Sequence, residues 1–486
     1  MVDFVNPPIP PFSKGGVGGM GGLLRLPRLT TFARGPRNDK GVHLYNRLII
    51  FLFFIFSSAN AYAWSDHYLD VLPALRVMPE INNASPVRVE RIETFLHAEK
   101  KGLEELLRAE EAWAENSVPE YPPRPDQLDF KATGNEDDLR ERFLHAIRIN
   151  PDVKIALFIE LPPGTQDRCK QTIPYRDVAT MIDDLRTPKM TFCVFREGER
   201  VAPLDVIASA SNEPDYEFDI GLWSDNGTSF GLLYGFGKQP FGNPKISYSS
   251  RAPFHMGFYH EPKIDYVLVP ILKKTYPEYR IHLFQSLARY ALKTDHPYWG
   301  YRFMGWGMHY VEDLTQPYHA SVIPGARVSH LIWINMMDML GFHKPKADAI
   351  GLVSNRHLVL EDFERDVIHE AYRNHEKDNP VLLALAKTNK DISYGPYNDE
   401  FPRAIISNEA HAKADAVNAA LTKWMPARFV NDPTYNFDPA VREEHVLDEL
   451  MEKNKEAVPP LTAIVADLME SFGVFSRSYV RSIIGN

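Results

Sequence analysis

Residues 309–320 read HYVEDLTQPYHA and place two imidazoles and one carboxylate within a dozen positions. His309 and Asp313 are four residues apart, so in a helix both side chains lie on one face and can hold one metal ion. In a continued helix, His319 would be rotated by roughly 80° from His309. Pro317 predicts a kink before it. We therefore expect a helix at His309 and Asp313, with His319 facing a neighbouring metal ion.

A second pair with the same spacing lies downstream in NRHLVLEDFERDV, where His357 precedes Glu361 by four residues. Nitrogen and oxygen ligands without cysteine suit zinc in a hydrolytic site that keeps a coordination position open. Taken alone, a histidine of this kind is more often a hydrogen-bonded core residue, and His357 with Glu361 also fits a solvent-facing helix pair. Two such pairs in one chain favour the metal interpretation.

Hydrophobic periodicity predicts a mainly α chain. Apolar positions at three-and-four spacing predict helices in two early segments and in most of the second half. The early segments are 86–116 and 137–150, and the later ones are 281–293, 298–314, 360–374, 407–425, 440–455 and 460–484. Residues 151–208 look more strand-like, which predicts a mixed α/β insertion at about 80–210.

The first 63 residues do not resemble part of a globular domain. Residues 1–42 are rich in Pro and Gly, and we expect them to be disordered or untranslated. Residues 43–63 combine Arg47, an apolar run over 48–56 and the sequence Ala-Tyr-Ala before Trp64, which predicts a signal peptide. The run is short for a membrane span. We expect a periplasmic or secreted protein that begins at Trp64.

Charge and cysteine content reduce the number of possible functions further. Removal of residues 1–63, which hold seven Lys/Arg and two Asp/Glu, takes the formal charge from −10 to −15. A chain this acidic has no general attraction for a polyanion, which counts against non-specific nucleic-acid binding. Cys169 and Cys193 are the only cysteines. They could pair in an oxidising compartment, but they do not make a disulfide scaffold or a metal-binding CxxC.

The stretch 309–320 resembles the signature of the zinc-dependent phospholipase C and S1/P1 nuclease superfamily, whose members carry H-x3-D-x5-H with Gln-Pro just before the last His. Residues 357–361 resemble the HxxxE or HxxxD that follows it, and 64–67 resemble the Trp-initiated mature terminus. The resemblance covers the mature chain discontinuously and does not extend to 80–210. It implies a helical bundle whose trinuclear zinc cluster hydrolyses phosphate esters, over a domain spanning 64–486.

The resemblance also implies a ligand set. Trp64 would chelate one zinc through its free α-amine and carbonyl oxygen, and His67 would complete that site. An α-amine titrates near pH 8, so a metal can displace its proton at little cost. Asp313 would bridge this zinc to a second one, held by His309 and an earlier Asp/His pair. The third zinc would take its ligands from three later residues: His319, His357 and Glu361.

The earlier Asp/His pair has two candidates. EPDYEFDIGLWSDN offers Asp215 and Asp219, and RAPFHMGFYHEP offers His255 and His260. The superfamily places Asp-Tyr before the loop and a His after it, which favours Asp215 and His255. Asp219 and His260 are then partners of the ligands, or surface residues.

The interval between His319 and His357 is longer than the resemblance implies and contains the apolar run HLIWINMMDMLGF, residues 330–342. His330 lies nearer the expected distance, but Ile334 stands where its carboxylate partner should be. We therefore favour His357 as the ligand. By default the apolar run is a buried helix, and the alternative is a lid or lipid-facing element beside the cleft.

These observations favour an exported zinc-dependent phosphodiester hydrolase that resembles phospholipase C. A metal-activated water would cleave phospholipid head groups, with Asp215 as the catalytic carboxylate that orients or deprotonates it. Such an enzyme would contact the membrane peripherally. The alternatives are an S1/P1-like nuclease on single-stranded nucleic acid, which needs base-stacking aromatics and a basic groove, and a non-catalytic zinc-binding surface protein.

Overall fold

A computed structural model describes residues 64, 66–181, 184–242, 247–440, 442 and 445–485. The chain divides into Met1–Phe51 and Leu52–Asn486, and all of the described residues belong to the second unit. The predicted leader at 1–42 and signal peptide at 43–63 lie outside the described residues.

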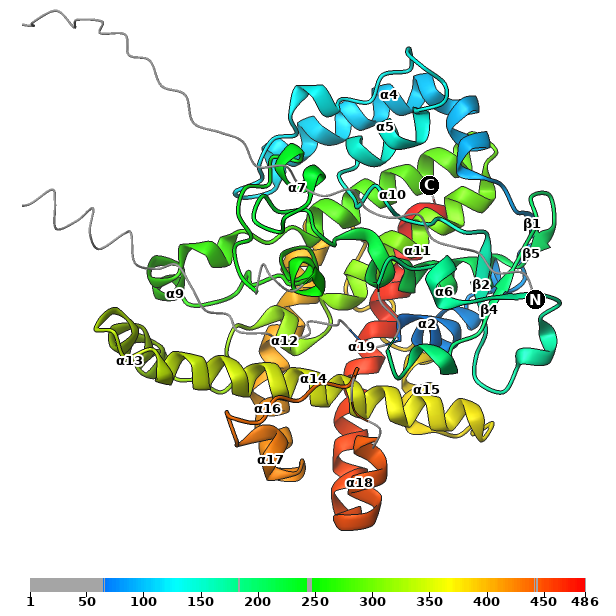
Figure 1. The fold of residues 1–486 in the computed structure, drawn as a ribbon. Coiled ribbons are helices and arrows are strands. Elements are labelled where there is room, and N and C mark those ends of the chain that lie inside the picture. Colours follow the sequence, from blue (N-terminus) through cyan, green and yellow to red (C-terminus); the bar gives the residue numbers. More distant parts are fainter. Residues whose placement is uncertain are drawn as a thin grey trace, which may run out of the picture. The chain divides into compact units, whose positions relative to one another are not determined.

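Helices make up most of the described chain, which confirms the mainly α class (Figure 1). In chain order the helices are α2 His67–Arg76, α3 Pro79–Asn82, α4 Ile92–Ser117, α5 Leu139–Ala146, α6 Pro203–Glu213, α7 Ser229–Leu233, α8 Ala252–His255, α9 Lys263–Leu268, α10 Pro277–Lys293, α11 Pro297–Asp313, α12 Pro317–Ala320, α13 Val328–Met339, α14 Lys344–Arg373, α15 Pro380–Leu385, α16 Asn408–Trp424, α17 Ala427–Val430, α18 Val446–Lys453 and α19 Val458–Ile484.

The described strands are short and form two small antiparallel sheets. Their bounds are β1 Val87–Arg88, β2 Phe158–Glu160, β3 Thr172–Ile173, β4 Phe192–Val194 and β5 Arg200–Val201. β1 pairs with β5, and the second sheet has the order β2-β4-β3, with Ile159 opposite Cys193. A disulfide joins Cys193 of β4 to Cys169, which precedes β3. The two cysteines therefore do pair.

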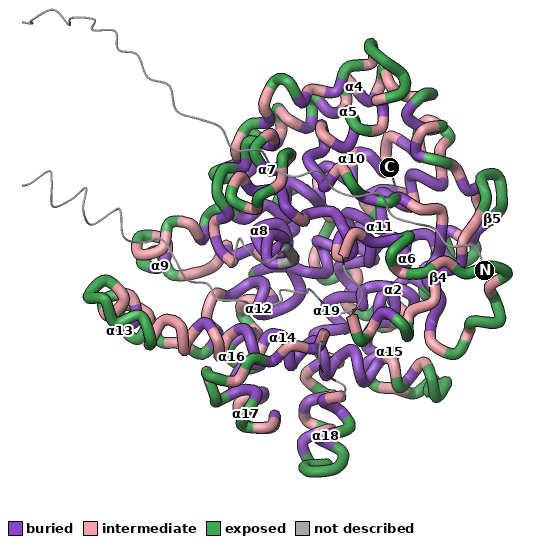
Figure 2. Tube along the Cα trace, viewed as in Figure 1, coloured by how far each residue is buried: buried purple, intermediate pink, exposed green. Residues whose placement is uncertain are grey.

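Helix α11 is the central element of the bundle and packs against α6, α10 and α19. Glycines let these neighbours come close. A Cβ built on Gly305 would lie 2.5 Å from the carbonyl oxygen of Ile207 in α6, and one on Gly307 would lie 2.0 Å from the Tyr479 hydroxyl in α19. Every residue of 302–320 is buried, so the whole His309–His319 segment lies in the core (Figure 2).

The expected early helices are present as α4 and α5, but the strand-like prediction for 151–208 is wrong from Pro203 onward. Residues Pro203–Glu213 form α6, which starts with proline at its first turn, where a missing N–H costs nothing. Every residue of α6 except Asp205 is buried. A helix buried all around has no polar stripe, so its sequence looks like a buried strand.

The expectation that 330–342 is a buried helix is also wrong. The run falls in α13 and the turn after it, and Ile334 is the only residue of α13 that is buried. α13 packs against α9 and against the long helix α14, which begins at Lys344 instead of the expected 360. Figure 2 shows α13 largely as exposed and half-exposed chain.

Helix α19 is long and apolar enough to cross a membrane by length and composition. More than half of its apolar window is buried, and it packs against α2, α11 and α15. These contacts are those of a core helix in the bundle.

Candidate metal centre

Eight of the predicted ligand side chains lie together in the core. They form three sets, in each of which one potential ligand atom per residue lies within 4.8 Å of the others: His67, His309 and Asp313; Asp215, His255 and His309; and His319, His357 and Glu361. The first two sets share His309, and we call their five side chains the bridging group. We call His319, His357 and Glu361 the terminal group. Together the two groups form the metal centre.

The eight side chains come from six separate segments of the chain, one of which is α11, and the fold brings the other five next to it. His67 begins α2, Asp215 lies in the π-helical turn Pro214–Phe218 after α6, and His255 ends α8. His309 and Asp313 occupy the last turns of α11, on one face as their spacing predicts. The terminal group combines two helices, with His319 on α12 and the other two members one turn apart on α14. Pro317 starts α12, so the predicted break before His319 is present.

Asp313 lies at the junction between the sets. Its Oδ2 is 2.8 Å from His255 Nδ1 and 3.4 Å from His309 Nε2. Its Oδ1 is 3.5 Å from His67 Nε2 and 3.8 Å from His319 Nδ1. Both oxygens are buried, and neither accepts a hydrogen bond of normal geometry from any described residue. A carboxylate with its two oxygens facing different imidazoles can bridge two cations.

In the bridging group, each imidazole has its other nitrogen held by the protein. His309 Nδ1 lies 2.7 Å from the Ser211 carbonyl oxygen, so it donates its proton there and leaves Nε2 free to ligate. His67 Nδ1 lies 2.8 Å from Glu312 Oε2. His255 Nε2 lies 3.3 Å from Asp219 Oδ2. Partners of this kind fix the ring orientation of metal-binding histidines.

The structure places Asp215, and not Asp219, among the ligand sets. Asp215 Oδ1 is 3.8 Å from both His255 Nδ1 and His309 Nε2. Asp219 instead accepts hydrogen bonds from Arg280 Nη2 and the Tyr310 hydroxyl, both at 2.6 Å, and supports His255 from outside. His260 lies apart from the sets, with Nε2 2.8 Å from the Arg403 carbonyl oxygen.

The terminal group has distances that suit one tetrahedral ion, whose ligand atoms lie roughly 3.3 Å apart for zinc. His319 Nε2 is 3.1 Å from His357 Nε2, and Glu361 Oε1 is 2.6 Å from His357 Nε2 and 3.9 Å from His319 Nε2. Gln316 Nε2 donates to Glu361 Oε1 at 2.9 Å, and Gln316 Oε1 accepts from the Tyr318 N–H at 2.6 Å. Gln316 therefore caps α12 and orients Glu361 at once.

Gln316 and Glu312 were missed by the sequence reasoning. Gln316 has a local signal, because a polar residue directly before a proline at a helix start is a capping position. Glu312 is the neighbour of Asp313 in the motif, but nothing in the sequence connects it to His67, from which it is separated by 245 positions.

The pKa shifts reflect the charge of the bridging group. Burial favours neutral imidazole, but the nearby Asp313 carboxylate and the contact with Glu312 outweigh it and raise the pKa of His67 to about 10. For His255, burial is likewise outweighed by Asp313 and Asp219, and the pKa rises to about 9. Burial alone would raise the pKa of Asp313, yet the surrounding imidazoles hold it well below its usual range. The group around Asp313 therefore attracts cations, protons included.

In the terminal group burial dominates, as it does at His309, where it lowers the pKa to about 3. Desolvation lowers the pKa of His319 and of His357 to about 3, and raises the pKa of Glu361 well above its usual range. Burial thus favours the neutral form of all three side chains. Neutral imidazole nitrogens keep their lone pairs available for a metal.

Whether metal ions fit this centre can be tested by asking which of its buried polar atoms lack a hydrogen bond. Several atoms of the centre have no hydrogen-bond partner of normal geometry in the described part of the chain: His67 Nε2, His319 Nδ1, Glu361 Oε2 and both oxygens of Asp313. Unsatisfied buried polar atoms are costly and rare. Their concentration among nitrogen and oxygen donors fits bound cations and does not identify the metal.

Trp64 is fully buried beside this centre. Its indole Nε1 donates to Thr315 Oγ1 at 3.0 Å, which anchors residue 64 next to the turn between α11 and α12. His67, three residues on, reaches Asp313. Trp64 and His67 thus contact the two ends of the stretch 312–315. Ligation through a free amine at Trp64 stays a prediction.

Asp215 marks the solvent side of the centre. Its side chain is 12% exposed, whereas the other seven ligand side chains are at most 4% exposed. The buried Arg251 guanidinium contacts the Asp215 carbonyl oxygen and its Oδ1 at 2.7 and 2.6 Å. A substrate from solvent would therefore meet Asp215 before any other ligand.

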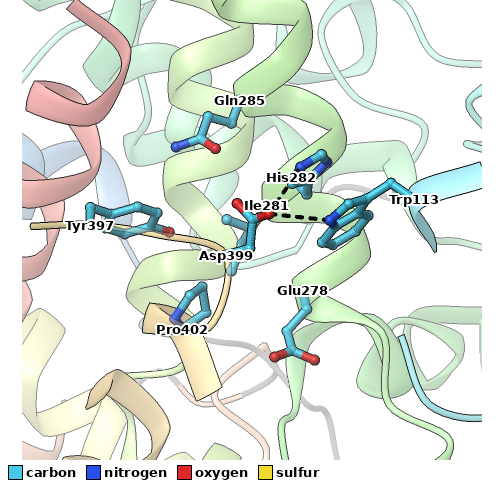
Figure 3. A pocket seen from close by; sticks show the side chains of 8 residues that line it. All are labelled: Trp113, Glu278, Ile281, His282, Gln285, Tyr397, Asp399 and Pro402. Carbon is cyan, nitrogen blue, oxygen red and sulfur yellow. Dashed lines mark hydrogen bonds and ion pairs between the residues drawn. The ribbon is translucent and has the colours of Figure 1, made fainter. Parts of the chain in front are cut away.

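A small hollow elsewhere on the bundle is not part of this centre (Figure 3). In it Trp113 stacks on His282 with ring centroids 3.6 Å apart, and Trp113 Nε1 donates to Asp399 Oδ2 at 3.3 Å. His282 Nδ1 lies 2.7 Å from Glu110 Oε2. These side chains satisfy one another, so the aromatic pair is not an open stacking surface.

The metal centre rests on the geometry of this chain alone. No family model, no curated protein and no solved structure matches the chain.

Proposed function

We infer that the chain is a zinc-dependent phosphodiester hydrolase of the phospholipase C and S1/P1 nuclease type, acting on phospholipid. The observation that carries this proposal is the position of Asp313, whose two buried oxygens face different pairs of imidazoles. A bridging carboxylate between groups of nitrogen and oxygen ligands is the arrangement that multinuclear zinc hydrolysis needs.

The proposed ligand assignment follows the ligand sets. The bridging group would hold two ions that share Asp313, one beside His67 and the backbone of Trp64, the other beside Asp215, His255 and His309. The terminal group would hold the third. When bound, zinc would polarise the phosphoryl oxygens and lower the pKa of a coordinated water.

The chain itself supplies orientation and proton transfer. Asp215, at the solvent side, would accept a proton from the attacking water through its carboxylate. Arg251 holds that carboxylate in position and brings a fixed positive charge close to where a phosphate would enter. The buried imidazoles stay oriented because Ser211, Glu312 and Asp219 hold their other nitrogens.

Export is part of the same proposal. The Cys169–Cys193 disulfide is typical of proteins that fold in an oxidising compartment. It agrees with the signal peptide expected before Trp64, and with a substrate that is reached from outside the cytoplasm.

One experiment tests the function. The protein beginning at Trp64 is purified, its zinc content is measured, and it is assayed with and without a chelator on phosphatidylcholine vesicles and on single-stranded DNA in parallel. We expect chelator-sensitive release of the phosphorylated head group, restored by zinc. Turnover of DNA alone would favour the nuclease alternative, and full zinc content without turnover of either substrate would favour a non-catalytic zinc-binding protein.

A further inference from the structure

Exposed apolar side chains gather at one place on the described surface. Of the fifteen large apolar side chains that are exposed there, nine lie on α9, on α13 or in the turn that follows α13. α9 and α13 pack against each other, so these side chains belong to one region, which we call the α9–α13 surface. Monomeric proteins rarely expose apolar side chains in such a concentration without a binding role.

The geometry of α13 concentrates them further. Ile332, Met336 and Leu340 are spaced four residues apart, so they form one stripe along the helix. Trp333 and Met339 flank this stripe, and Phe342 follows it. The exposed fractions are 50% for Met336 and 65% for Leu340. The only charged residue within α13 is Asp338, and Lys346 and His343 pair with it.

Basic residues surround this surface in an otherwise acidic chain. Residues 263–274 and 327–346 together hold six Lys/Arg and two Asp/Glu, whereas the whole chain holds 54 and 64. Lys263, Lys273, Lys274, Arg327 and Lys344 are exposed, and Lys344 pairs with Asp348 at 2.7 Å. One of the two acids, Asp265, is buried. The local charge is therefore opposite in sign to that of the protein.

The combination of exposed apolar side chains with bordering basic ones indicates the kind of partner that this surface binds. An apolar helix face with Trp, Phe, Met and Leu, bordered by Lys and Arg, is the composition of helices that lie in the interface of anionic membranes. The apolar stripe enters the head-group region while the lysines stay near the lipid phosphates.

The surface is also joined directly to the metal centre. α14 begins two residues after Phe342 and reaches His357 after about 20 Å of continuous helix. α9 follows shortly after α8, which ends at His255, and α13 follows α12, which carries His319. The segments that carry three of the ligands therefore lead straight into the α9–α13 surface.

We propose that the α9–α13 surface docks the protein onto anionic phospholipid bilayers. The proposal rests on the proposed function, in which the substrate is a membrane phospholipid. It adds a membrane-binding element that is separate from the ligands and acts before any chemistry.

The test measures binding and chemistry independently. Zinc-loaded protein beginning at Trp64 is sedimented with vesicles of equal parts phosphatidylcholine and phosphatidylglycerol, and its turnover is measured on the water-soluble diester bis(p-nitrophenyl) phosphate. We expect the double variant Trp333→Asn/Met336→Asn to lower vesicle binding by roughly tenfold or more, because two large side chains no longer enter the lipid. Zinc content and turnover of the soluble diester should not change.

Matched controls use exposed apolar residues outside the surface. Leu383→Asn and Ile392→Asn remove side chains that are 49% and 91% exposed, and binding should stay at the wild-type level. The charge-reversal variant Lys273→Glu/Lys274→Glu should weaken binding to the mixed vesicles more than to pure phosphatidylcholine.

The outcomes separate the two proposals. Wild-type binding by Trp333→Asn/Met336→Asn would overturn the docking proposal while leaving the hydrolase intact. A wild-type dimer that this variant converts to a monomer, with no vesicle binding by either protein, would assign the surface to a second copy of the chain and overturn lipid docking. Vesicle binding by a protein that hydrolyses no diester would keep the docking surface and remove the proposed function.

Discussion

The bridging and terminal groups lie next to each other but are held in place in different ways. In the bridging group, a protein oxygen outside the group holds the second nitrogen of every imidazole, and those oxygens belong to Ser211, Glu312 and Asp219. In the terminal group, the carboxylate oxygen facing His319 Nδ1 is Asp313 Oδ1 at 3.8 Å, which is a longer separation than the 3.3 Å or less found in the bridging group, and Gln316 orients only the Glu361 carboxylate. The bridging group is therefore positioned before metal binds, whereas the terminal group depends more on the ion itself.

The bridging and terminal groups also differ in charge. The bridging group contains an ionised Asp313 and two histidines whose pKa values are raised to about 10 and 9, so it binds protons when metal is absent. Burial favours the neutral form of the terminal group. We conclude that the bridging group provides the long-range attraction for cations, and that the terminal group gains its ion mainly through short-range ligation.

The largest expected effect is that of Asp313→Asn. In the proposed arrangement it would remove a negative charge from between two dications and leave their repulsion unrelieved, so the loss should exceed that of an ordinary ligand. We expect zinc content to fall by more than one ion per chain and hydrolysis of vesicles and DNA to be abolished, as measured by elemental analysis and both assays. Asp265→Asn, another buried aspartate, is the control and should keep its zinc. Full zinc content and turnover in Asp313→Asn would refute the bridging role.

The next effect concerns Trp64 as the proposed start of the exported chain. One additional residue before Trp64 converts the proposed ligand amine into an amide, so the extended protein should bind less zinc and lose most of its activity. Trp64→Phe is the matched control, because it keeps the free amine and loses only the indole bond to Thr315. Equal zinc and activity in the extended protein would remove Trp64 from the ligands.

Changes in the terminal group should cost one ion. Glu361→Ala and His357→Ala are each expected to lower metal content and activity, with little change in the helical far-UV signal, because the bundle has its own core. Glu364→Gln tests whether the loss of zinc depends on which buried carboxylate of α14 is changed, since Glu364 is also buried and lies one turn further along the helix. If Glu361→Ala kept its full zinc content, the third ion would have to bind elsewhere.

The smallest effect tests the support of the bridging group. Glu312→Gln weakens the hold on His67 Nδ1 without removing a ligand, and such partners are worth about 10- to 100-fold in metal affinity. Competition with a chromophoric chelator measures this change. Glu110→Gln alters a matching contact at 2.7 Å to His282, far from the centre along the chain, and should leave zinc affinity unchanged. Identical affinity in both variants would mean that Glu312 does not position His67.

Local spacing made part of this centre predictable. His309 with Asp313, and His357 with Glu361, are four residues apart, and the helical period alone places each pair on one face. Asp215 and His255 depend on folding over a longer distance, and were chosen only through the resemblance. Their place beside His309 depends on how α6, α8 and α11 pack, which no local pattern encodes.

The fold was predictable where helices are amphipathic, and less so where they are uniformly apolar. Residues 86–116 and 281–293 have clear polar faces and became α4 and α10. Residues 203–213 and 328–339 have little polar periodicity, and one is a buried helix while the other is exposed. Apolar composition indicates a preference to leave water, but it does not determine whether a core or another surface will provide the contact.

The disulfide between Cys169 and Cys193 has a consequence for the position of His67. Strands of two or three residues cannot hold a sheet together alone. Closing a loop over a sequence separation of 24 restricts the unfolded chain enough to stabilise the folded segment by roughly 3 kcal/mol. Glu160, at the end of β2, contacts Asn212, which accepts a hydrogen bond from Tyr68 N–H in the first turn of α2. Through this chain of contacts, a reductant that opens one peripheral bond would loosen the backbone next to His67.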